Sequence, residues 1–529
     1  ADRRATVVAV AGGHPLWVSA ERLAQMELVC PGLQAEPPIN AAHAGRRSEA
    51  VSREQALRDL LRSRLETLGP VTAAVLAAPL GVPVADAEIA LLALEVEGQA
   101  MRGRFRTPAP AEEWCDRRLL ARIHRYTLKT LRRGVEPVSP AAYMRFLFRW
   151  HQLGEDQATG PDGIQTSLSG VLGRLVGFPV PAAAWEGSVL PARLREFQPA
   201  ALDQVLAGGE FLWVRLVAEG AGLQRLGPIR TTPILFLERR QLEVWQSLLP
   251  GATASSVPAT RVPRSPAAAR IEETLQKHGA VFFVDLLRVS GLERNAAEAG
   301  LRELIAGGLV SGDGYAGLRT LLLPAAQRRA TEWRRSVSAD LPGRWSLVMP
   351  QLAPVPVGSA VAKLRRAAVE HVALVLLDRY GVVFRSVLQR EAPFLPPWRE
   401  LAHAWRRLEA RGKIRGGRFV AGFGGEQFAL PEAIDRLRGA RHAGNQDAQV
   451  ILSAADPLNL TGIVTPGDKV PSVLRNRVLY RNGVPVAAWV GGEFTWVGTP
   501  DAQGEWAARN SLARACAPFR YVEGPARAS

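Results

Sequence analysis

Apolar residues recur along most of the chain at the spacing of amphipathic helices, and short alternating stretches follow them. The first helical stripe after residue 50 consists of five leucines: Leu57, Leu60, Leu61, Leu65 and Leu68. Ser52 and Gln55 precede this stripe at the spacing of a helix cap. Two further helical patterns and a pair of short strand patterns come next, and glycines end the first and third helices. The pattern predicts a small helical unit that is closed by a β-hairpin.

The same unit recurs along the chain. Its two helix-ending glycines are 29 residues apart at Gly69 and Gly98 (98 − 69), 29 at Gly279 and Gly308 (308 − 279), 31 at Gly381 and Gly412 (412 − 381) and, in a looser copy, 31 at Gly177 and Gly208 (208 − 177). A recurring unit defines an architecture better than a single motif does. Three helices followed by paired strands are the parts of a winged-helix module, so we predict at least four modules in tandem.

The last part of the chain has a different period. Residues 448–498 alternate as strands do, and Asn482-Gly483 is a strong signal for a hairpin turn. We expect a small β-barrel or a curled sheet here. The predicted fold class is therefore α+β, with tandem winged-helix modules, four or five in number, followed by a small β-barrel.

The changes of pattern also give the expected domain boundaries. Residues 1–50 are too few for a domain and form the end of a preceding region with its linker. The other expected segments are winged helix 1 (51–110), a helical connector or further winged-helix element (111–162), winged helix 2 (163–249), a linker with winged helix 3 (250–323), a connector (324–361), winged helix 4 (362–435) and the β-barrel (448–529). Because the chain begins without methionine inside a strand-like pattern, we expect it to be a piece of a longer protein.

The fourth unit has the most basic combination of third helix and hairpin. The helix expected at 397–411 and the residues after it carry seven cations: Arg399, Arg406, Arg407, Arg411, Lys413, Arg415 and Arg418. Such a helix can enter a DNA groove while the hairpin contacts phosphate. A single unit of this kind would more often be a helix–hairpin junction with solvated charges, and salt bridges to other modules are a second alternative. Because the unit is repeated, we predict that these seven residues contact DNA.

Other charged stretches are weaker candidates. The third helix of the first unit, 86–97, is acidic, so phosphate would repel it and we expect it to pack against protein. The helix after Trp114 is rich in arginine, and a phosphate contact and a solvated face are equally good interpretations. The third helix of the third unit carries Arg294 and Arg302 as further candidates. The stretch 143–153 is apolar nearly all round and should be buried.

Catalytic residues are unknown from the sequence, with two weak candidates. Asp456 precedes Pro457 and could be a catalytic carboxylate, although an Asp-Pro pair at the end of a strand is more often a turn. Gln152 follows His151 at the end of a buried helix, where such a pair is more often a satisfied cap or core group. No GxxxxGK[ST] loop, GxSxG or HExxH pattern is present, and we expect no cofactor or metal site in this chain.

Composition favours a polyanionic partner, most often nucleic acid. The 529 residues carry a formal net charge of +16, and the pI is about 10.7. Part of this basicity can come from a GC-rich genome, since arginine is far more frequent than lysine. Three widely spaced cysteines and the absence of a signal peptide or a long apolar run fit a reducing cytoplasm, with association to the nucleoid expected.

Long stretches of the sequence resemble the C-terminal half of the large helicase-related (Lhr) proteins. They are YMRFLFRWHQL (143–153), GFPVPAAAWEGSVLPARL (177–194), RGKIRGGRFVAGFGGEQFALPEA (411–433), SAADPLNLTGIVTPG (453–467) and NRVLYRNGVPVA (476–487). The resemblance spans nearly the whole chain. It implies a bacterial superfamily 2 helicase that moves 3′ to 5′ on DNA, acts in DNA repair, and binds ATP and Mg in a motor domain N-terminal to this chain. Residues 1–50 would then be the end of the helicase core.

The resemblance also implies two functions for the chain itself. The family's C-terminal region is similar to a string of winged helices with a β-barrel, and it forms homo-oligomers, a tetramer being plausible. This suggests a module that holds DNA, single-stranded, duplex or paired with RNA, and assembles subunits while the motor works. The region is also similar to the AlkZ type of DNA glycosylase, so the alternative is excision of a damaged or crosslinked base. The Gln-x-Gln or Gln-x-Asp motif of those glycosylases is not convincingly placed here.

Overall fold

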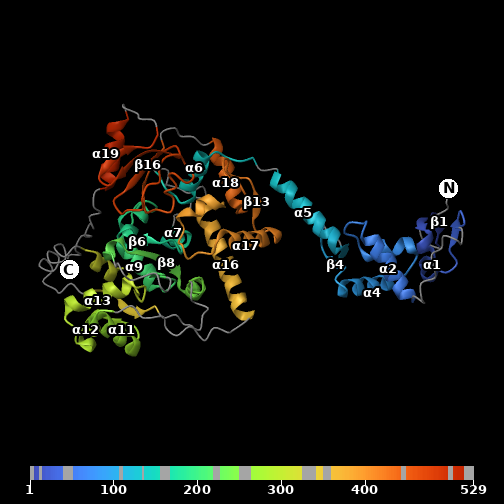
Figure 1. Cartoon of the computed structure of the whole chain (residues 1–529), viewed down its shortest axis with the longest axis horizontal. Coiled ribbons are helices and arrows are strands. Elements are labelled where there is room, and N and C mark those ends of the chain that lie inside the picture. The colour runs from blue at the N-terminus through green and yellow to red at the C-terminus, as the bar shows by residue number, and fades with distance from the viewer. Residues whose placement is uncertain are drawn as a thin grey trace, which may run out of the picture. The chain divides into compact units, whose positions relative to one another are not determined.

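The structure is a computed structural model, and it divides into two units, Ala1–Gly134 and Val135–Ser529. Each unit is described by itself (Figure 1). The residues that the structure describes are 5–10, 15–39, 52–106, 111–133, 136–154, 167–217, 227–249, 264–323, 341–348, 359–442, 448–498 and 504–516. Most of the expected linker after residue 249 and most of the connector expected at 324–361 lie outside these residues.

The first unit begins with a three-stranded antiparallel sheet in the order β2-β1-β3 and one helix. These elements are β1 (Ala5–Ala9), β2 (Leu16–Ser19), α1 (Ala20–Val29) and β3 (Gln34–Glu36). The first helical repeat follows: α2 (Arg53–Leu65), α3 (Ala73–Ala77), η2 (Ala78–Leu80), α4 (Val84–Val96), β4 (Ala100–Gly103) and β5 (Glu113–Asp116), and then α5 (Arg117–Arg133). Ser52 Oγ accepts the backbone N–H of Gln55 at 3.2 Å, which confirms the predicted cap of α2. Val71 forms a bridge with Trp114, so β5 lies between Val71 and β4.

Three more helical repeats lie in the second unit. The first contains β6 (Val180–Pro181), α7 (Leu168–Leu175), α8 (Ala182–Ala184), η3 (Trp185–Val189), α9 (Pro199–Ala207), β7 (Phe211–Val214) and β8 (Pro233–Glu238). The next contains α11 (Pro266–His278), β9 (Val281–Phe282), α12 (Phe283–Ser290), α13 (Arg294–Ala306), β10 (Val310–Gly312) and β11 (Arg344–Leu347). The last contains α16 (Ser359–Tyr380), β12 (Val382–Val383), η7 (Arg385–Arg390), α17 (Trp398–Ala410), β13 (Arg415–Gly417) and β14 (Gln427–Ala429).

The small sheets of these repeats share one strand order. They are β6-β8-β7, β9-β11-β10 and β12-β14-β13, all antiparallel, so the last strand along the chain is always the central one. The bridge of Val71 to β5 gives the same order in the first unit. The periodicity of the sequence therefore corresponds to a repeated topology.

Two of the predicted helix-ending glycines differ from the expectation. Helix α2 ends at Leu65, and Gly69 is not among the described glycines with positive φ. Gly412 has φ +73°, in the left-handed region that ends helices, as the sequence predicted. Gly208 instead has φ −63°, and the following Gly209 takes φ +77°. In the loosest repeat, the predicted helix-ending glycine is therefore one residue too early. Either of two adjacent glycines can adopt the left-handed conformation that ends the helix, and the sequence does not distinguish them.

The expected β-barrel does not form. The C-terminal strands make an antiparallel sheet in the order β15-β16-β17-β18, and the described strands contain no pair between β15 and β18 that would close it. These elements are β15 (Gln449–Ser453), β16 (Arg477–Arg481), β17 (Val484–Val490), β18 (Glu493–Trp496) and the helix α19 (Glu505–Cys516). Four strands are too few for closure, since small barrels use about five to eight. The strands form an open sheet instead, and the hairpin predicted at Asn482-Gly483 joins β16 to β17.

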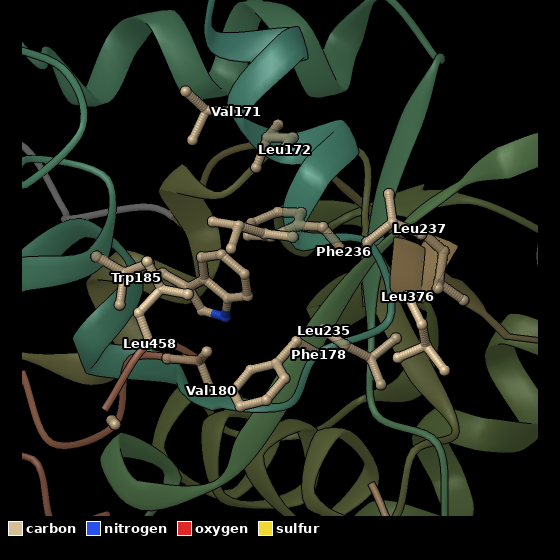
Figure 2. Close-up of a cluster of buried hydrophobic side chains, with 14 of the residues drawn as sticks. Val171, Leu172, Phe178, Val180, Trp185, Leu235, Phe236, Leu237, Leu376 and Leu458 are labelled. Carbon is tan, nitrogen blue, oxygen red and sulfur yellow. The ribbon is translucent and has the colours of Figure 1, made fainter. Parts of the chain in front are cut away.

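One contiguous hydrophobic core runs through the second unit. Helix α6 (Pro140–Trp150) contributes six buried large side chains, as its all-round apolar sequence predicted: Tyr143, Met144, Phe146, Leu147, Phe148 and Trp150. Figure 2 shows another part of this core, where Trp185 meets Phe236 edge to face with ring centroids 4.6 Å apart. The remaining elements around it are η5 (Ile229–Thr231), η6 (Arg239–Gln241), α10 (Leu242–Gln246), α14 (Ala316–Leu322) and α18 (Pro431–His442).

No single helix in the described ranges is long and apolar enough to span a membrane. Only the bent pair Ala73–Leu80 and Val84–Val96 meets the length and composition criteria when both are taken together.

Candidate nucleic-acid interface

Helix α17 has one buried and one exposed face. Leu401, Trp405 and Leu408 are buried, and Trp405 Nε1 donates to the carbonyl of Ala373 in α16 at 3.0 Å. This contact fixes α17 against α16 (Figure 1). The opposite face carries Arg399, His403, Arg406 and Ala410, all exposed and spaced at three or four residues. The apolar spacing therefore directs the basic side chains outward.

The wing after α17 is held by buried polar groups. The backbone N–H of Lys413 donates to the carbonyl of Leu408 at 3.0 Å, which closes the helix at Gly412. Glu409 is buried and accepts the backbone N–H of Gly416 at 3.1 Å. The start of the wing is thus tied to the last turn of the helix.

Gln427 fixes the far side of the wing. Its side chain is fully buried, and its Oε1 accepts the backbone N–H groups of Phe419 at 2.9 Å and Val420 at 2.8 Å. Its Nε2 donates to the carbonyl of Val420 at 2.9 Å. Val138, before α6, adds a parallel bridge to Val420. The loop that carries Arg418 is therefore positioned by specific contacts.

The seven predicted DNA contacts fall into two groups. Three are paired within the same repeat: Arg406 with Glu426 (3.1 Å), Arg411 with Glu370 (2.6 Å) and Arg407 with Glu370 (3.9 Å). The other four, Arg399, Lys413, Arg415 and Arg418, are exposed and have no acidic partner among the residues that the structure describes. The alternative that salt bridges account for part of this positive charge is therefore correct. The acidic partners lie in the same repeat, however, and not in other modules.

His403 is a candidate that the sequence analysis missed. It is exposed, four residues after Arg399 and three before Arg406, on the same face of α17. That spacing was visible in the sequence and could have identified it.

The third helices of the other repeats present less free positive charge. In α13, Arg294 and Arg302 both pair with Glu298, at 3.4 and 3.1 Å. Asp86 of α4 pairs with Arg53, and Glu97, which follows α4, pairs with Arg58 and Arg62; all three arginines lie in α2. The outer face of α4 carries three exposed apolar side chains, Ile89, Leu92 and Val96. These features distinguish α17 from the helices at the same place in the other repeats.

Helix α5 is the second basic element. Arg118, Arg122 and Arg125 are exposed at helical spacing, and none has an acidic partner within the described part of the chain. The structure therefore leaves both the phosphate-contact and the solvated-face interpretations open.

One of the two catalytic candidates, Asp456, is held by structural contacts. Asp456 is 1% exposed, and its oxygens accept both terminal nitrogens of Arg193, at 2.6 and 2.9 Å. Its Oδ1 also accepts the backbone N–H of Leu458 at 3.0 Å, the contact of a turn-forming aspartate. Gln152 has φ +55° just after α6. The buried His151 beside it contacts the carbonyl of Arg379 through Nε2 at 2.7 Å, and burial, together with Arg193, holds its pKa well below the usual range.

No group of three or more His, Cys, Asp or Glu side chains in the described ranges gathers as metal ligands would.

Two family models match the second unit. Both are described as "Large helicase-related protein, winged-helix domain"; the model of the third such domain covers residues 138–237 and that of the fourth covers 362–449. The chain is an Lhr-like region. The fourth-domain match contains α17 and its wing, so the candidate interface belongs to a winged-helix domain. Neither match includes the repeat at 266–347.

Two curated proteins support this assignment for most of the Lhr-like region. The chain is 32% identical over 491 residues to "Lhr helicase/ probable uracil glycosylase" of Mycolicibacterium smegmatis, covering 87% of this chain and 30% of that protein. It is 28% identical over 459 residues to "Lhr helicase/uracil glycosylase" of Escherichia coli, covering 79% of this chain and 28% of that protein. The Lhr-like region thus spans less than a third of either relative.

Proposed function

We propose that this helicase-related region binds DNA, and that α17 and its wing form the contact surface. The observation that carries the proposal is a set of four exposed cations on a winged-helix domain that have no acidic partner in the described part of the chain: Arg399, Lys413, Arg415 and Arg418. A third helix and a wing with unpaired cations suit a groove contact and a phosphate contact, respectively. The net charge of +16 supports a polyanionic partner.

The test is the salt dependence of DNA binding, measured by fluorescence anisotropy with labelled duplex and single-stranded DNA. The double variant Arg415→Glu with Arg418→Glu removes two expected phosphate contacts. Each contact contributes about 0.7–0.9 to the slope of log K against log salt, so the slope should become less steep by roughly 1.4–1.8. Arg438→Glu is the matched control, because Arg438 is an exposed arginine of α18 that pairs with Asp435. Equal slopes for the three proteins would refute the proposal.

The repeated strand order supports a further proposal, that all four helical repeats are winged helices. We also propose that the region acts with an ATP-dependent motor outside this chain, which would bind ATP and Mg and support repair. The word helicase in the names of both relatives supports the motor.

We propose in addition that the region assembles with copies of itself. The exposed apolar face of α4, with Ile89, Leu92 and Val96, supports a protein contact there. Light scattering of the chain, with and without DNA, measures the assembly. A monomer in both conditions would contradict this part of the proposal.

The second candidate function is DNA glycosylase activity, favoured by the words uracil glycosylase in the relatives' names. Such an enzyme extrudes a base and hydrolyses its glycosidic bond. Incubation with uracil-containing or crosslinked DNA without ATP, followed by alkali, reveals this activity as strand breaks. Intact strands after complete binding would exclude it for those lesions.

A further inference from the structure

A cleft of about 680 Å³ lies beside the start of α17. It is within the range of roughly 300–1,000 Å³ that is usual for small-ligand sites. Its wall comes from α16, from η7, from the residues between η7 and α17, and from the start of α17. The polar and aromatic side chains of its lining include Arg385, Gln389, Glu391 and Trp398, and its apolar neighbours include Leu376, Leu395 and Leu401.

Trp398 gives the cleft an aromatic wall. Its ring lies 5.3 Å from that of Trp405, measured between centroids, at an angle of 52°. Trp405 is itself fully buried and anchored to α16 by its indole N–H. The Trp398 ring is therefore supported from behind, as a surface for stacking requires.

Glu391 places a buried carboxylate in the same wall. Its side chain is 4% exposed, and its Oε1 accepts the Tyr380 hydroxyl at 2.7 Å and a guanidinium N–H of Arg379. Its Oε2 is buried and has no hydrogen-bond partner among the described residues. A buried acceptor without a donor is costly, and a ligand N–H group would satisfy it.

The rim of the cleft is positively charged. Arg385 is exposed and has no acidic partner in the described ranges. Lys469 donates through Nζ to Gln389 Oε1 at 2.9 Å, which places a second cation at this wall. Cations at a rim suit a phosphate group, whereas the aromatic wall and the carboxylate oxygen suit a base.

We propose that this cleft holds one unstacked nucleotide of the DNA strand that α17 and its wing bind. This inference rests on the proposed function. The base stacks on Trp398, an N–H group of the base donates to Glu391 Oε2, and Arg385 and Lys469 contact the adjoining phosphate. The repeat then grips a strand at one base in addition to its backbone.

Photocrosslinking tests the inference on the full chain. Single-stranded oligonucleotides carry 5-iodouracil at successive positions, and mass spectrometry maps the crosslinked residue. We expect the crosslink at Trp398, and its loss in Trp398→Leu with about a tenfold weaker affinity, since stacking of one base typically contributes this much or more. Trp506→Leu is the matched control, because Trp506 is 76% exposed on α19, and it should retain the Trp398 crosslink. Gln389→Ala, at an exposed position, should weaken the crosslink without affecting folding.

The outcomes separate the two proposals. An oligonucleotide that binds, as anisotropy shows, but gives no crosslink at Trp398 would overturn the inference and leave the DNA-binding proposal intact. Failure of any oligonucleotide to bind would overturn both. Free 5-iodo-deoxyuridine monophosphate distinguishes the two sources of a nucleotide. A crosslink at Trp398 from the monophosphate but not from the oligonucleotide would overturn the assignment to a DNA strand.

Discussion

The buried pair of Arg193 and Asp456 allows a structural role to be separated from a catalytic one. The informative change is Asp456→Asn, which keeps the size of the side chain and removes its charge. Both side chains are 1% exposed, and two nitrogen–oxygen contacts of 2.6 and 2.9 Å join them. The variant leaves the Arg193 guanidinium buried without a counter-charge. Loss of one partner from such a pair costs about 3–5 kcal/mol.

Urea unfolding of the full chain, followed by tryptophan fluorescence, measures this cost. With a denaturant dependence of roughly 3 kcal/mol per molar urea, the transition of the second unit should move by about 1 M or more to lower urea. The double variant Arg193→Met with Asp456→Leu is the control. It removes both charges and should regain most of the stability, because apolar replacements of a buried pair are often neutral.

An unfolding free energy of Asp456→Asn within about 0.5 kcal/mol of that of the unchanged protein would contradict a structural role for the pair, because changes of that size are typical of ordinary surface positions. If Asp456→Asn has normal stability but no longer makes alkali-labile sites in uracil-containing DNA, the result would point to catalysis by Asp456. Low stability together with recovery in the double variant would establish the structural role.

Three further predictions concern His151, the helix-ending glycines and the wing. Burial lowers the pKa of His151, so below about pH 6.5 only the unfolded chain binds a proton at this side chain. The free energy of unfolding is therefore full above that pH and falls below it by up to about 1.4 kcal/mol per pH unit. His151→Gln should remove this fall, which urea unfolding at several pH values measures. Gly412→Ala, in open surroundings, should lower the free energy of unfolding by about 1–2 kcal/mol because of its positive φ. Gly177→Ala has φ +78° and also places a methyl group against the Trp245 ring, so its loss should be roughly twice as large. Equal losses for the two variants would contradict the packing argument. Gln427→Leu leaves two buried N–H groups of the wing without acceptors, so hydrogen exchange of that loop should accelerate by tenfold or more, and unchanged exchange would show that Gln427 does not hold it.

The sequence was sufficient for the features that depend on local chemistry. Helix-ending glycines such as Gly412 and the apolar stripes gave the repeats, because both act within one or two helical turns. The mutual pairing of Arg294, Glu298 and Arg302 has the spacing of neighbours on a helix, so it too could have been read from the sequence.

The candidate site was only partly predictable, because an arginine can be paired with an acidic residue that is far away in the sequence. Arg411 meets Glu370, 41 residues earlier in the chain, and Asp456 meets Arg193 across 263 residues. Nothing in either local sequence indicates these partners. The β-barrel was overpredicted for a related reason, since alternation identifies strands but does not determine whether the first strand pairs with the last.

The central position of the last strand has a consequence for how the protein is made. Among the described strands, β9 and β10 of the repeat at 266–347 each pair with β11 and with no other strand. The strand β11 begins 32 residues after β10 ends (344 − 312). Until β11 has left the ribosome, β9 and β10 therefore have no hydrogen-bonding neighbour in their sheet. Such open edges invite pairing with other chains. Truncations that end between residues 312 and 344 should therefore be prone to aggregation, and boundaries for shortened versions are best placed after a central strand.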